Sequence, residues 1–380
     1  MEKIFIIGLG YIGLPLACLL SEKKKIFCID INQKKINNLK NKIIPFKEKK
    51  LKKLFIKNYK NFNFDNKYSY SKNKSVFIIC VPTPLNKNKA NLSFLKKVFK
   101  KINSKLKKGD LILIESTIPP GTTEMLYKKY KLNKKSIFMA YCPERAIPGN
   151  TLNEMRYNVR IIGGVNKKSS YFAKKIYEIF AKKIIVTSHI YAEISKLAEN
   201  THRLVNIALV NQINSLCKKY NLVSKNLFEI VNYHPRVNFL KPGIGIGGHC
   251  IPIDPLFLNQ DNKLKIIKTS IEINEKITQD TSKEILSNIK NSKKKKILFL
   301  GITYKENVDD IRESPSIKII KKVKKTVKNL KIFDPFNSSM NNIKFKELNK
   351  IKFDLVVYLV NHKVFKKYKI NSRNILDYRY

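Results

Sequence analysis

A glycine-rich stretch near the start of the chain constrains its fold more than any other feature. Gly8, Gly10 and Gly13 follow an apolar run at Ile4 to Ile7 in the pattern G-x-G-x-x-G, and Asp30 ends the next apolar run. A spacing of about 20 residues between glycines and acid is typical of a dinucleotide-binding βαβ unit. The glycines let the backbone approach a pyrophosphate, which the free N–H groups of the following helix then bind. The stretch therefore predicts a parallel α/β sheet that begins with a nucleotide site.

Asp30 also predicts which dinucleotide binds. Its carboxylate would accept hydrogen bonds from the hydroxyls of the adenosine ribose, and it would repel a 2′-phosphate. NAD is therefore the expected cofactor, in preference to NADP.

Apolar runs that alternate with helical patterns extend this sheet through the first half of the 380-residue chain. A single helix without Gly or Pro is expected from about Ala192 to Tyr220, and a second α/β unit after the lysine run Lys293 to Lys296. The predicted strands are Ile4–Ile7, Ile26–Asp30, Val76–Val81, Leu111–Glu115 and Ile137–Tyr141, then Ile297–Leu300, Lys331–Phe333 and Leu355–Val360.

These patterns predict an α/β protein with two Rossmann-like doubly wound domains, joined by a central helical domain with a long connecting helix. The expected boundaries are residues 1–188 for the NAD-binding domain, 189–291 for the helical domain and 292–380 for the C-terminal domain.

The net charge of +49 would ordinarily suggest nucleic acid or an anionic membrane as partner. Almost all of the positive charge is lysine spread over predicted helix faces, with eight arginines and no groove-reading module. Neither a dedicated nucleic-acid partner nor a membrane is therefore expected. No later stretch approaches the roughly 18 apolar residues of a membrane span.

The six cysteines form no C-x-x-C pair and no regular framework, so a reducing cytosol is expected, with no disulfide scaffold and no metal site. Cys18, Cys28 and Cys80 lie inside apolar elements and suit small buried hydrophobes. Cys250 differs, because it ends the glycine-rich loop K-P-G-I-G-I-G-G-H-C that begins at Lys241. Backbone close to substrate and a thiolate at the rim are what a covalent mechanism needs.

On the long predicted helix, Lys196, Asn200 and Arg203 are spaced i, i+4 and i+7 and share one face. On an ordinary surface helix such a face is a solvated polar stripe. Here the neighbouring surface is apolar, and a partly buried lysine can move protons near neutrality.

Seven motifs in succession resemble the UDP-glucose/GDP-mannose dehydrogenase family. They are G-L-G-Y-I-G-L-P from Gly8, V-P-T-P from Val81, E-S-T-I-P-P-G from Glu115, C-P-E-R from Cys142, K-L-A-E-N from Lys196, G-G-H-C-I-P-I-D-P from Gly247 and D-D-I-R-E-S-P from Asp309. Within that family, C-P-E-R-A-I-P-G and N-Y-H-P-R-V-N are most similar to the branch that oxidises UDP-N-acetylmannosamine to its uronic acid, for use in surface polysaccharide.

The resemblance implies a four-electron oxidation at C6. Lys196, or a water that it holds, would take the hydroxyl proton, Cys250 would add to the resulting aldehyde, and a water held by Glu144, Thr117 and Asp254 would hydrolyse the thioester. A homodimer built on the long helix is also implied, with Arg236 reaching the neighbour's substrate.

The resemblance assigns three sets of residues, some of them shared. The catalytic set is Cys250, Lys196, Asn200, Glu144, Asp254 and Thr117. The NAD set is Gly8, Gly10, Tyr11, Ile12, Gly13, Asp30, Thr83, Thr117 and Arg312. The sugar-nucleotide set is Arg145, Ala146, Lys196, Asn200, Arg203, His234, Arg236, Gly247, Tyr304 and Lys305.

Two positions depart from the family pattern. The acidic E-P-x-L element is replaced by I-P-F-K-E near Pro45, and Tyr304 stands where a Phe is usual. Rival hypotheses are a sister enzyme for UDP-N-acetylglucosamine or UDP-glucose, a 3-hydroxyacid dehydrogenase, which would need no cysteine loop, and a basic binding protein without activity.

Overall fold

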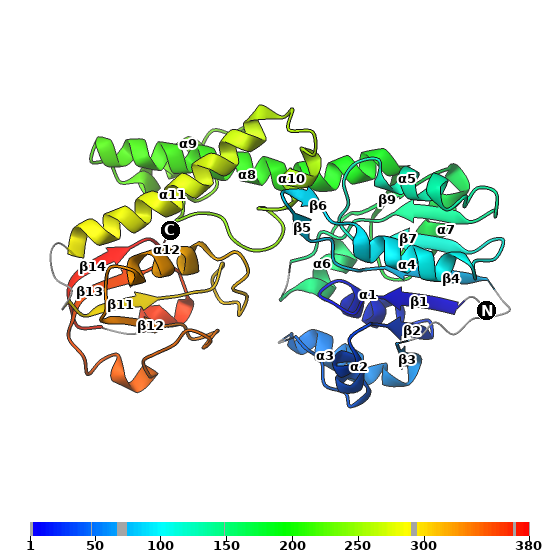
Figure 1. Cartoon of the computed structure of the whole chain (residues 1–380), viewed down its shortest axis with the longest axis horizontal. Helices are drawn as coiled ribbons and strands as arrows, with labels where there is room; N and C mark the ends of the chain where they lie inside the picture. Colours follow the sequence, from blue (N-terminus) through cyan, green and yellow to red (C-terminus); the bar gives the residue numbers. More distant parts are fainter. Residues whose placement is uncertain are drawn as a thin grey trace. The chain divides into compact units, whose positions relative to one another are not determined.

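The computed structural model describes residues 3–46, 48–66, 74–147, 149–289, 295–367 and 370–379. Within them the chain divides into two compact units, Met1–Ala198 and Glu199–Tyr380, and the division falls inside the long helix α8, His189–Lys219 (Figure 1). The predicted boundary between residues 291 and 292 lies outside the described residues, as does Lys293 of the predicted linker. The three-domain boundaries therefore stay a prediction.

The first unit is built on an eight-stranded sheet with the order β10-β9-β8-β7-β4-β1-β2-β3. The six strands of this sheet that come first in the chain lie side by side in the order β3-β2-β1-β4-β7-β8. This is the strand order of a doubly wound dinucleotide-binding sheet. The strands are β1 Lys3–Ile7, β2 Ile26–Ile29, β3 Phe62–Asp65, β4 Ser75–Ile79, β7 Leu111–Ile114, β8 Phe138–Tyr141, β9 Arg160–Gly164 and β10 Ile184–Ser188, beside a hairpin of β5 Leu85–Asn86 and β6 Lys89–Ala90.

Alternate residues of β1 enter two different cores, because successive side chains of a strand point to opposite faces. Ile4 and Ile6 pack in one cluster with the buried residues of α1, α3, α6 and α7, and Phe5 and Ile7 in another with those of α4 and α5. The helices are α1 Gly13–Leu20, α2 Gln33–Lys40, α3 Lys49–Lys57, α4 Ser93–Asn103, α5 Thr122–Lys129, α6 Thr151–Tyr157 and α7 Lys167–Tyr177, with a 3₁₀ turn at Tyr59–Asn61.

Three strands of this sheet, β3, β9 and β10, were not anticipated from the sequence. β9 pairs antiparallel with β8, and β10 then pairs parallel with β9. An antiparallel neighbour needs no long crossover, and mixed sheets with a reversed strand near one edge are common. The reversal brings the first residue of β9, Arg160, to the end of the sheet where β7 and β8 finish.

The second unit holds a four-stranded parallel sheet with the order β12-β11-β13-β14. One face packs against α11 and α12, and the other is covered by loops and short 3₁₀ turns around Leu348 and Phe365. The elements are α9 Ser224–Asn232, α10 Asp254–Leu258, α11 Lys265–Ile289, β11 Ile297–Leu300, α12 Pro315–Lys324, β12 Leu330–Phe333, β13 Phe353–Tyr358 and β14 Ser372–Asp377, with 3₁₀ turns at Phe345–Glu347 and Lys363–Lys367.

The predicted fold class is confirmed: two α/β sheets of Rossmann type are joined through helices that include the long α8. Each predicted strand is present within two residues of its expected ends. Among the described residues, no helix combines the length and the apolar character needed to cross a bilayer.

Candidate active site

The first glycine loop has the close backbone packing that its sequence predicts. Gly8 has a φ of 94°, and a Cβ there would lie 2.6 Å from the carbonyl oxygen of Cys80. A Cβ on Gly13 would collide with the carbonyl of Gly8, whereas one on Gly10 would meet nothing within 4 Å. The turn therefore requires glycine at positions 8 and 13, whereas Gly10 leaves the backbone open to a ligand. Bare backbone at the N-terminus of α1 fits a dinucleotide pyrophosphate.

Tyr11 and Ile12 occupy the rim of this loop. Tyr11 is 41% exposed, and its ring lies 4.3 Å from that of Phe46. Ile12 is the N-cap residue of α1.

Asp30, the residue predicted to bind the ribose, follows β2 and is buried. Its Oδ2 accepts from the backbone N–H of Leu9 at 2.9 Å and its Oδ1 from that of Asn32 at 2.9 Å. Lys35, which sequence reasoning missed, places its Nζ 2.7 Å from Oδ2. A carboxylate has about four acceptor positions, so an acceptor position remains for a ribose hydroxyl.

Two threonine motifs meet where β4 and β7 end. The hydroxyl of Thr83 donates to the carbonyl of Thr117 at 2.7 Å, and that of Ser116 donates to the carbonyl of Val81 at 2.7 Å. The structure therefore brings the V-P-T-P and E-S-T-I-P-P-G segments together at the carboxyl edge of the sheet, where doubly wound folds bind ligands.

Glu144 is buried and lies shortly after β8, which ends at Tyr141. Its Oε1 accepts from the backbone N–H groups of Arg145 and Ala146, at 2.6 and 2.7 Å, and its Oε2 contacts the guanidinium of Arg160. Arg145 and Ala146 are half-buried, and the Arg145 guanidinium donates to the carbonyl of Val159. Arg160 was not predicted as a site residue. Its position opposite the buried Glu144 becomes apparent only from the pairing of β8 with β9.

Glu193 fixes the start of α8 and was also missed by sequence reasoning. Its Oε2 accepts from the N–H of Gly121 at 2.6 Å, and its Oε1 from the N–H and hydroxyl of Thr123 at 2.8 and 2.6 Å. A carboxylate at the first N–H groups of α5 caps that helix. Lys196 lies one turn later on α8 and is 7% exposed, so its ammonium is largely withdrawn from water.

In the second unit, Asn200 and Asp254 form a buried pair. The Nδ2 of Asn200 donates to Oδ2 of Asp254 at 2.6 Å, and both residues are under 8% exposed. Asp254 begins α10, and its N–H donates to the carbonyl of Cys250 at 2.8 Å. The predicted nucleophile is thus tied through the backbone to the predicted carboxylate and amide.

Cys250 is the exposed member of the six cysteines, all of which the structure describes. Burial raises the pKa of the Cys18, Cys28 and Cys142 thiols well above the usual range. Cys18 and Cys28 are buried, as predicted, and a raised pKa makes a thiol a poor nucleophile. Cys80 is half-buried by residue, and burial of its thiol raises its pKa as well.

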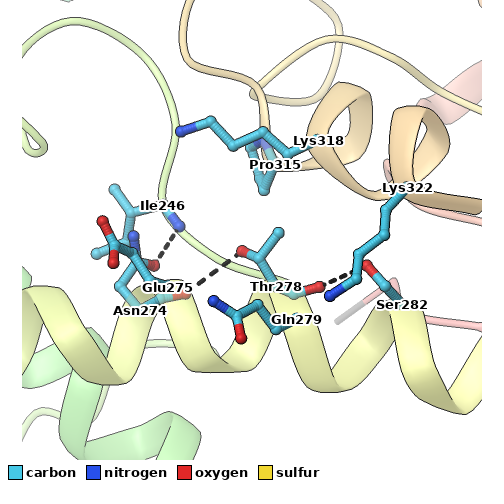
Figure 2. Close-up of a pocket in the computed structure, with 9 residues that line it drawn as sticks. All are labelled: Ile246, Asn274, Glu275, Thr278, Gln279, Ser282, Pro315, Lys318 and Lys322. Carbon is cyan, nitrogen blue, oxygen red and sulfur yellow. Dashed lines mark hydrogen bonds between the residues drawn. The ribbon is translucent and has the colours of Figure 1, made fainter.

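Three side chains from α8 and α11 hold the second glycine loop by its backbone. Asn211 accepts from the N–H of Gly243 at 2.8 Å, Thr278 donates to the carbonyl of Ile244 at 2.9 Å, and Asn274 accepts from the N–H of Ile246 at 2.5 Å. Figure 2 shows Asn274 and Thr278 beside a pocket of about 250 Å³, to which α12 contributes Pro315 and two lysines. The backbone of the loop before Cys250 is thus anchored to α8 and α11.

Gly247 and Gly248 lie against Tyr304. A Cβ on Gly247 would approach the Cβ of Tyr304 to 2.7 Å, and one on Gly248, whose φ is 83°, would approach its ring to 2.8 Å. The N–H of Gly248 donates to the carbonyl of Arg312 at 2.9 Å. Three predicted ligand residues, Gly247, Tyr304 and Arg312, are therefore neighbours in the second unit. The Arg312 guanidinium forms a fork with Asp310.

The remaining predicted residues are exposed. Arg203 is exposed although Lys196 and Asn200 on the same helix are buried, and Lys305 is exposed beside Tyr304. His234 and Arg236 follow α9, with an Arg236 Nη2 3.4 Å from Nε2 of His234. Their roles toward the sugar nucleotide stay predictions, as does that of Arg312 toward NAD.

Three models of one family match consecutive parts of the chain. They are the NAD binding domain (residues 2–181), the central domain (191–276) and the UDP binding domain (298–380) of the UDP-glucose/GDP-mannose dehydrogenase family. The chain belongs to this family. It is an NAD-dependent UDP-sugar dehydrogenase.

Relatives and a solved structure agree with this assignment. The chain is 40% identical to a UDP-N-acetyl-D-mannosamine dehydrogenase of Methanococcus vannielii, over 97% of this chain and 88% of the relative. It is 35% identical to a protein of the same name from Campylobacter jejuni, over 96% of both chains. The structure of a UDP-D-ManNAc dehydrogenase from Pyrococcus horikoshii superposes with a TM-score of 0.92 at 32% identity, covering 100% of this chain and 95% of that one.

Proposed function

We propose that the enzyme oxidises UDP-N-acetyl-D-mannosamine at C6 to UDP-N-acetyl-D-mannosaminuronate. The observation that carries the chemistry is Cys250, an exposed thiol on a clamped glycine loop and joined through Asp254 to Asn200. Support for the sugar comes from the H-P-R-V-N segment and from the names of the relatives. The product would supply an acidic sugar for surface polysaccharide.

Lys196 and Cys250 share the covalent chemistry. The neutral amine of Lys196, or a water that Lys196 holds, accepts the proton of the C6 hydroxyl. NAD, when bound, would supply the hydride acceptor for each of the two oxidations. The Cys250 thiolate adds to the aldehyde carbon, so the intermediate stays attached until the second oxidation converts it to a thioester. Asn200 donates to the developing oxyanion, a role usually worth a few kcal/mol per donor.

Hydrolysis of the thioester is assigned to Glu144, Thr117 and Asp254. Water adds to the thioester carbonyl, the carbon–sulfur bond breaks, and the Cys250 thiolate leaves. One proton of the water passes to Glu144 and then to solvent. Retention on Cys250 lets both oxidations occur without release of a reactive aldehyde.

Binding of the two ligands is assigned as the family resemblance implies. NAD is held by Gly8, Gly10, Gly13 and their neighbours Tyr11 and Ile12, with Asp30 on the ribose and Thr83, Thr117 and Arg312 at its other contacts. The sugar nucleotide is held by Arg145, Ala146, Lys196, Asn200, Arg203, His234, Arg236, Gly247, Tyr304 and Lys305.

A substrate panel tests the choice of sugar. A site whose donors face an acetamido group leaves them unpaired with UDP-glucose, at a cost of roughly 1–3 kcal/mol per group. UDP-N-acetylmannosamine should therefore exceed UDP-glucose in kcat/KM by about a hundredfold or more. UDP-N-acetylglucosamine should also be poor, because its acetamido group points to the other face of the ring. Comparable values for UDP-glucose would remove the substrate assignment.

The proposal includes a homodimer in a reducing cytosol, with Arg236 acting in the neighbour's site. Mixing inactive Arg236→Ala and Cys250→Ala chains should then restore activity through hybrid sites. No recovery in verified mixed dimers would place Arg236 in the site of its own chain.

A further inference from the structure

In the first unit, Glu144 belongs to a buried ion cluster with Arg160 and Glu115. In the antiparallel register of β8 and β9, Ala140 pairs with Gly164 and Tyr141 with Gly163. Continued past the end of β8, that register sets Arg160 opposite Glu144. Glu115, which directly follows β7, lies next along the same edge.

Arg160 bridges the two acids. One terminal nitrogen contacts Oε2 of Glu144, and the other contacts Oε1 of Glu115 and donates to the carbonyl of Cys142 at 3.0 Å. The guanidinium carbon lies 4.4 Å from the centre of the Tyr177 ring, and the Tyr177 hydroxyl donates to Glu115. Arg160 and Glu115 are each 3% exposed, so the bridge is closed to water.

Burial of this cluster carries a large desolvation cost for the fold. Two acids and one guanidinium are removed from water, and hydrophobic side chains of similar volume often serve stability as well or better. Burial, together with the nearby Glu144, raises the pKa of Glu115 to about 7 despite the attraction of Arg160. Stability alone therefore gives little reason for these residues.

The contacts of Glu144 suggest what the cluster does. Backbone N–H groups hold Oε1, and Arg160 holds Oε2, so the carboxylate has a fixed plane and direction. We propose that Arg160 is a positioning residue for Glu144 in thioester hydrolysis, and that Glu115 holds Arg160 in place. This inference rests on the proposed function, because it assigns Glu144 to the water.

Arg160→Gln tests the positioning directly. NAD binding and formation of the Cys250 thioester should remain, while hydrolysis should slow about tenfold or more, since small misplacements of a catalytic group cost that much. Mass spectrometry of rapidly denatured enzyme should show the sugar adduct accumulating on Cys250. Arg160→Lys should recover part of the hydrolysis rate. Equal slowing of the first oxidation and of hydrolysis would overturn the proposal.

A double-mutant cycle separates positioning from general damage. If Arg160 acts through Glu144, then Arg160→Gln should change hydrolysis little in a Glu144→Gln background. Additive losses would contradict the proposal. A wild-type enzyme that never forms an adduct on Cys250 would instead refute the proposed function, so the two failures are distinguishable.

Glu115→Gln keeps the cluster testable if Arg160 variants do not fold, because Arg160 remains paired with Glu144, whereas loss of Arg160 leaves two buried carboxylates without their cation. Glu115 faces Arg160, Glu144, Tyr177 and the thiols of Cys80 and Cys142. In this variant, the pH profile of hydrolysis should lack an ionisation near pH 7 that the wild type shows. The pH profile of the first oxidation should be the same as in the wild type. An unchanged hydrolysis profile would exclude Glu115 from the positioning.

Discussion

The two sheets of this molecule begin with the same strand–glycine–acid arrangement and use it differently. Gly8 and Gly301 each follow a strand with a φ of 94°. The next N–H, of Leu9 or Ile302, donates to the acid that follows the neighbouring strand, Asp30 at 2.9 Å or Asp334 at 2.7 Å. The backbone frame is therefore common to both units.

The partners of the two acids differ. Asp30 accepts from two N–H groups and Lys35. Asp334 accepts from Ile302 and Thr303 and from two further N–H groups, and its Oδ2 lies 3.1 Å from Nε2 of His362. With every acceptor position occupied, Asp334 has none for a ribose.

The two loops also differ at a glycine position, and this difference again favours a dinucleotide only in the first unit. Position 303 holds a threonine, whose hydroxyl donates to the carbonyl of Lys305, where the first loop has the bare Gly10. The comparison teaches that a Rossmann frame does not itself bind a dinucleotide; free acceptors and bare backbone do. In the second unit the acid instead organises the loop that carries Tyr304 and Lys305.

The largest expected effect is that of Asp334→Ala on stability. Removing this carboxylate leaves several buried N–H groups without a partner and should lower the free energy of unfolding by about 3–5 kcal/mol. Asp30→Ala, which orphans fewer groups, should cost about 1–2 kcal/mol. Urea denaturation of the two variants measures both. Equal losses would mean that the acids are structurally equivalent.

The second prediction concerns pH, because the two units hold their buried acids differently. Burial opposes ionisation of Asp334, but the hydrogen bonds from His362 and the backbone outweigh it and hold its pKa below the usual range. Its stabilisation is present above the unfolded pKa and is lost in acid. The pKa of Glu115 is shifted in the opposite direction: its value of about 7 in the folded protein exceeds the ordinary 4.5.

Glu115 therefore binds more protons in the folded state between those two values, and stability should fall as pH rises through that window. The loss should reach roughly 3 kcal/mol between pH 4.5 and 8 in the wild type. Glu115→Gln should remove this slope when the two proteins are denatured in parallel at pH 5 and pH 8. Identical slopes would show that Glu115 is already ionised when folded.

A smaller effect is expected for cofactor choice. Asp30→Ala removes the acceptor for the ribose and the charge that repels a 2′-phosphate. The preference for NAD over NADP in kcat/KM should fall by roughly 10- to 100-fold, which corresponds to about 1–3 kcal/mol. Asp334→Asn, which keeps the carbonyl acceptor, is the matched control and should leave the ratio unchanged.

Lys35→Ala should have the smallest effect. The pair with Asp30 is partly exposed, so its loss should change stability by at most about 1 kcal/mol. Removing a positive charge near the place of a 2′-phosphate should raise the preference for NAD by no more than about fivefold. A shift toward NADP would show that Lys35 holds Asp30 in position instead.

Sequence patterns predicted the parts of the fold that depend on local order. The Gly8 loop, Asp30 and the central strands follow from spacing and apolar runs, and the i, i+4 relation of Lys196 and Asn200 follows from helix geometry. The reversed strand β9 could not be predicted in this way, because its pairing depends on contacts between segments distant in the chain.

The supporting residues of the site were missed for the same reason. Arg160, Glu193, Asn211, Asn274 and Thr278 belong to no dense motif, and each acts through a backbone or carboxylate group brought near by folding. The second glycine cluster did signal where the loop before Cys250 had to pack closely. It did not indicate which helices hold that loop.

The number of NADH molecules formed per sugar oxidised tests the central claim most directly. Because Cys250 retains the aldehyde, the wild type should form two NADH for each UDP-N-acetylmannosamine consumed, with no free aldehyde. Cys250→Ala should bind NAD normally and form no uronate. One NADH per sugar with released aldehyde in the wild type, or normal uronate from Cys250→Ala, would contradict the covalent four-electron oxidation.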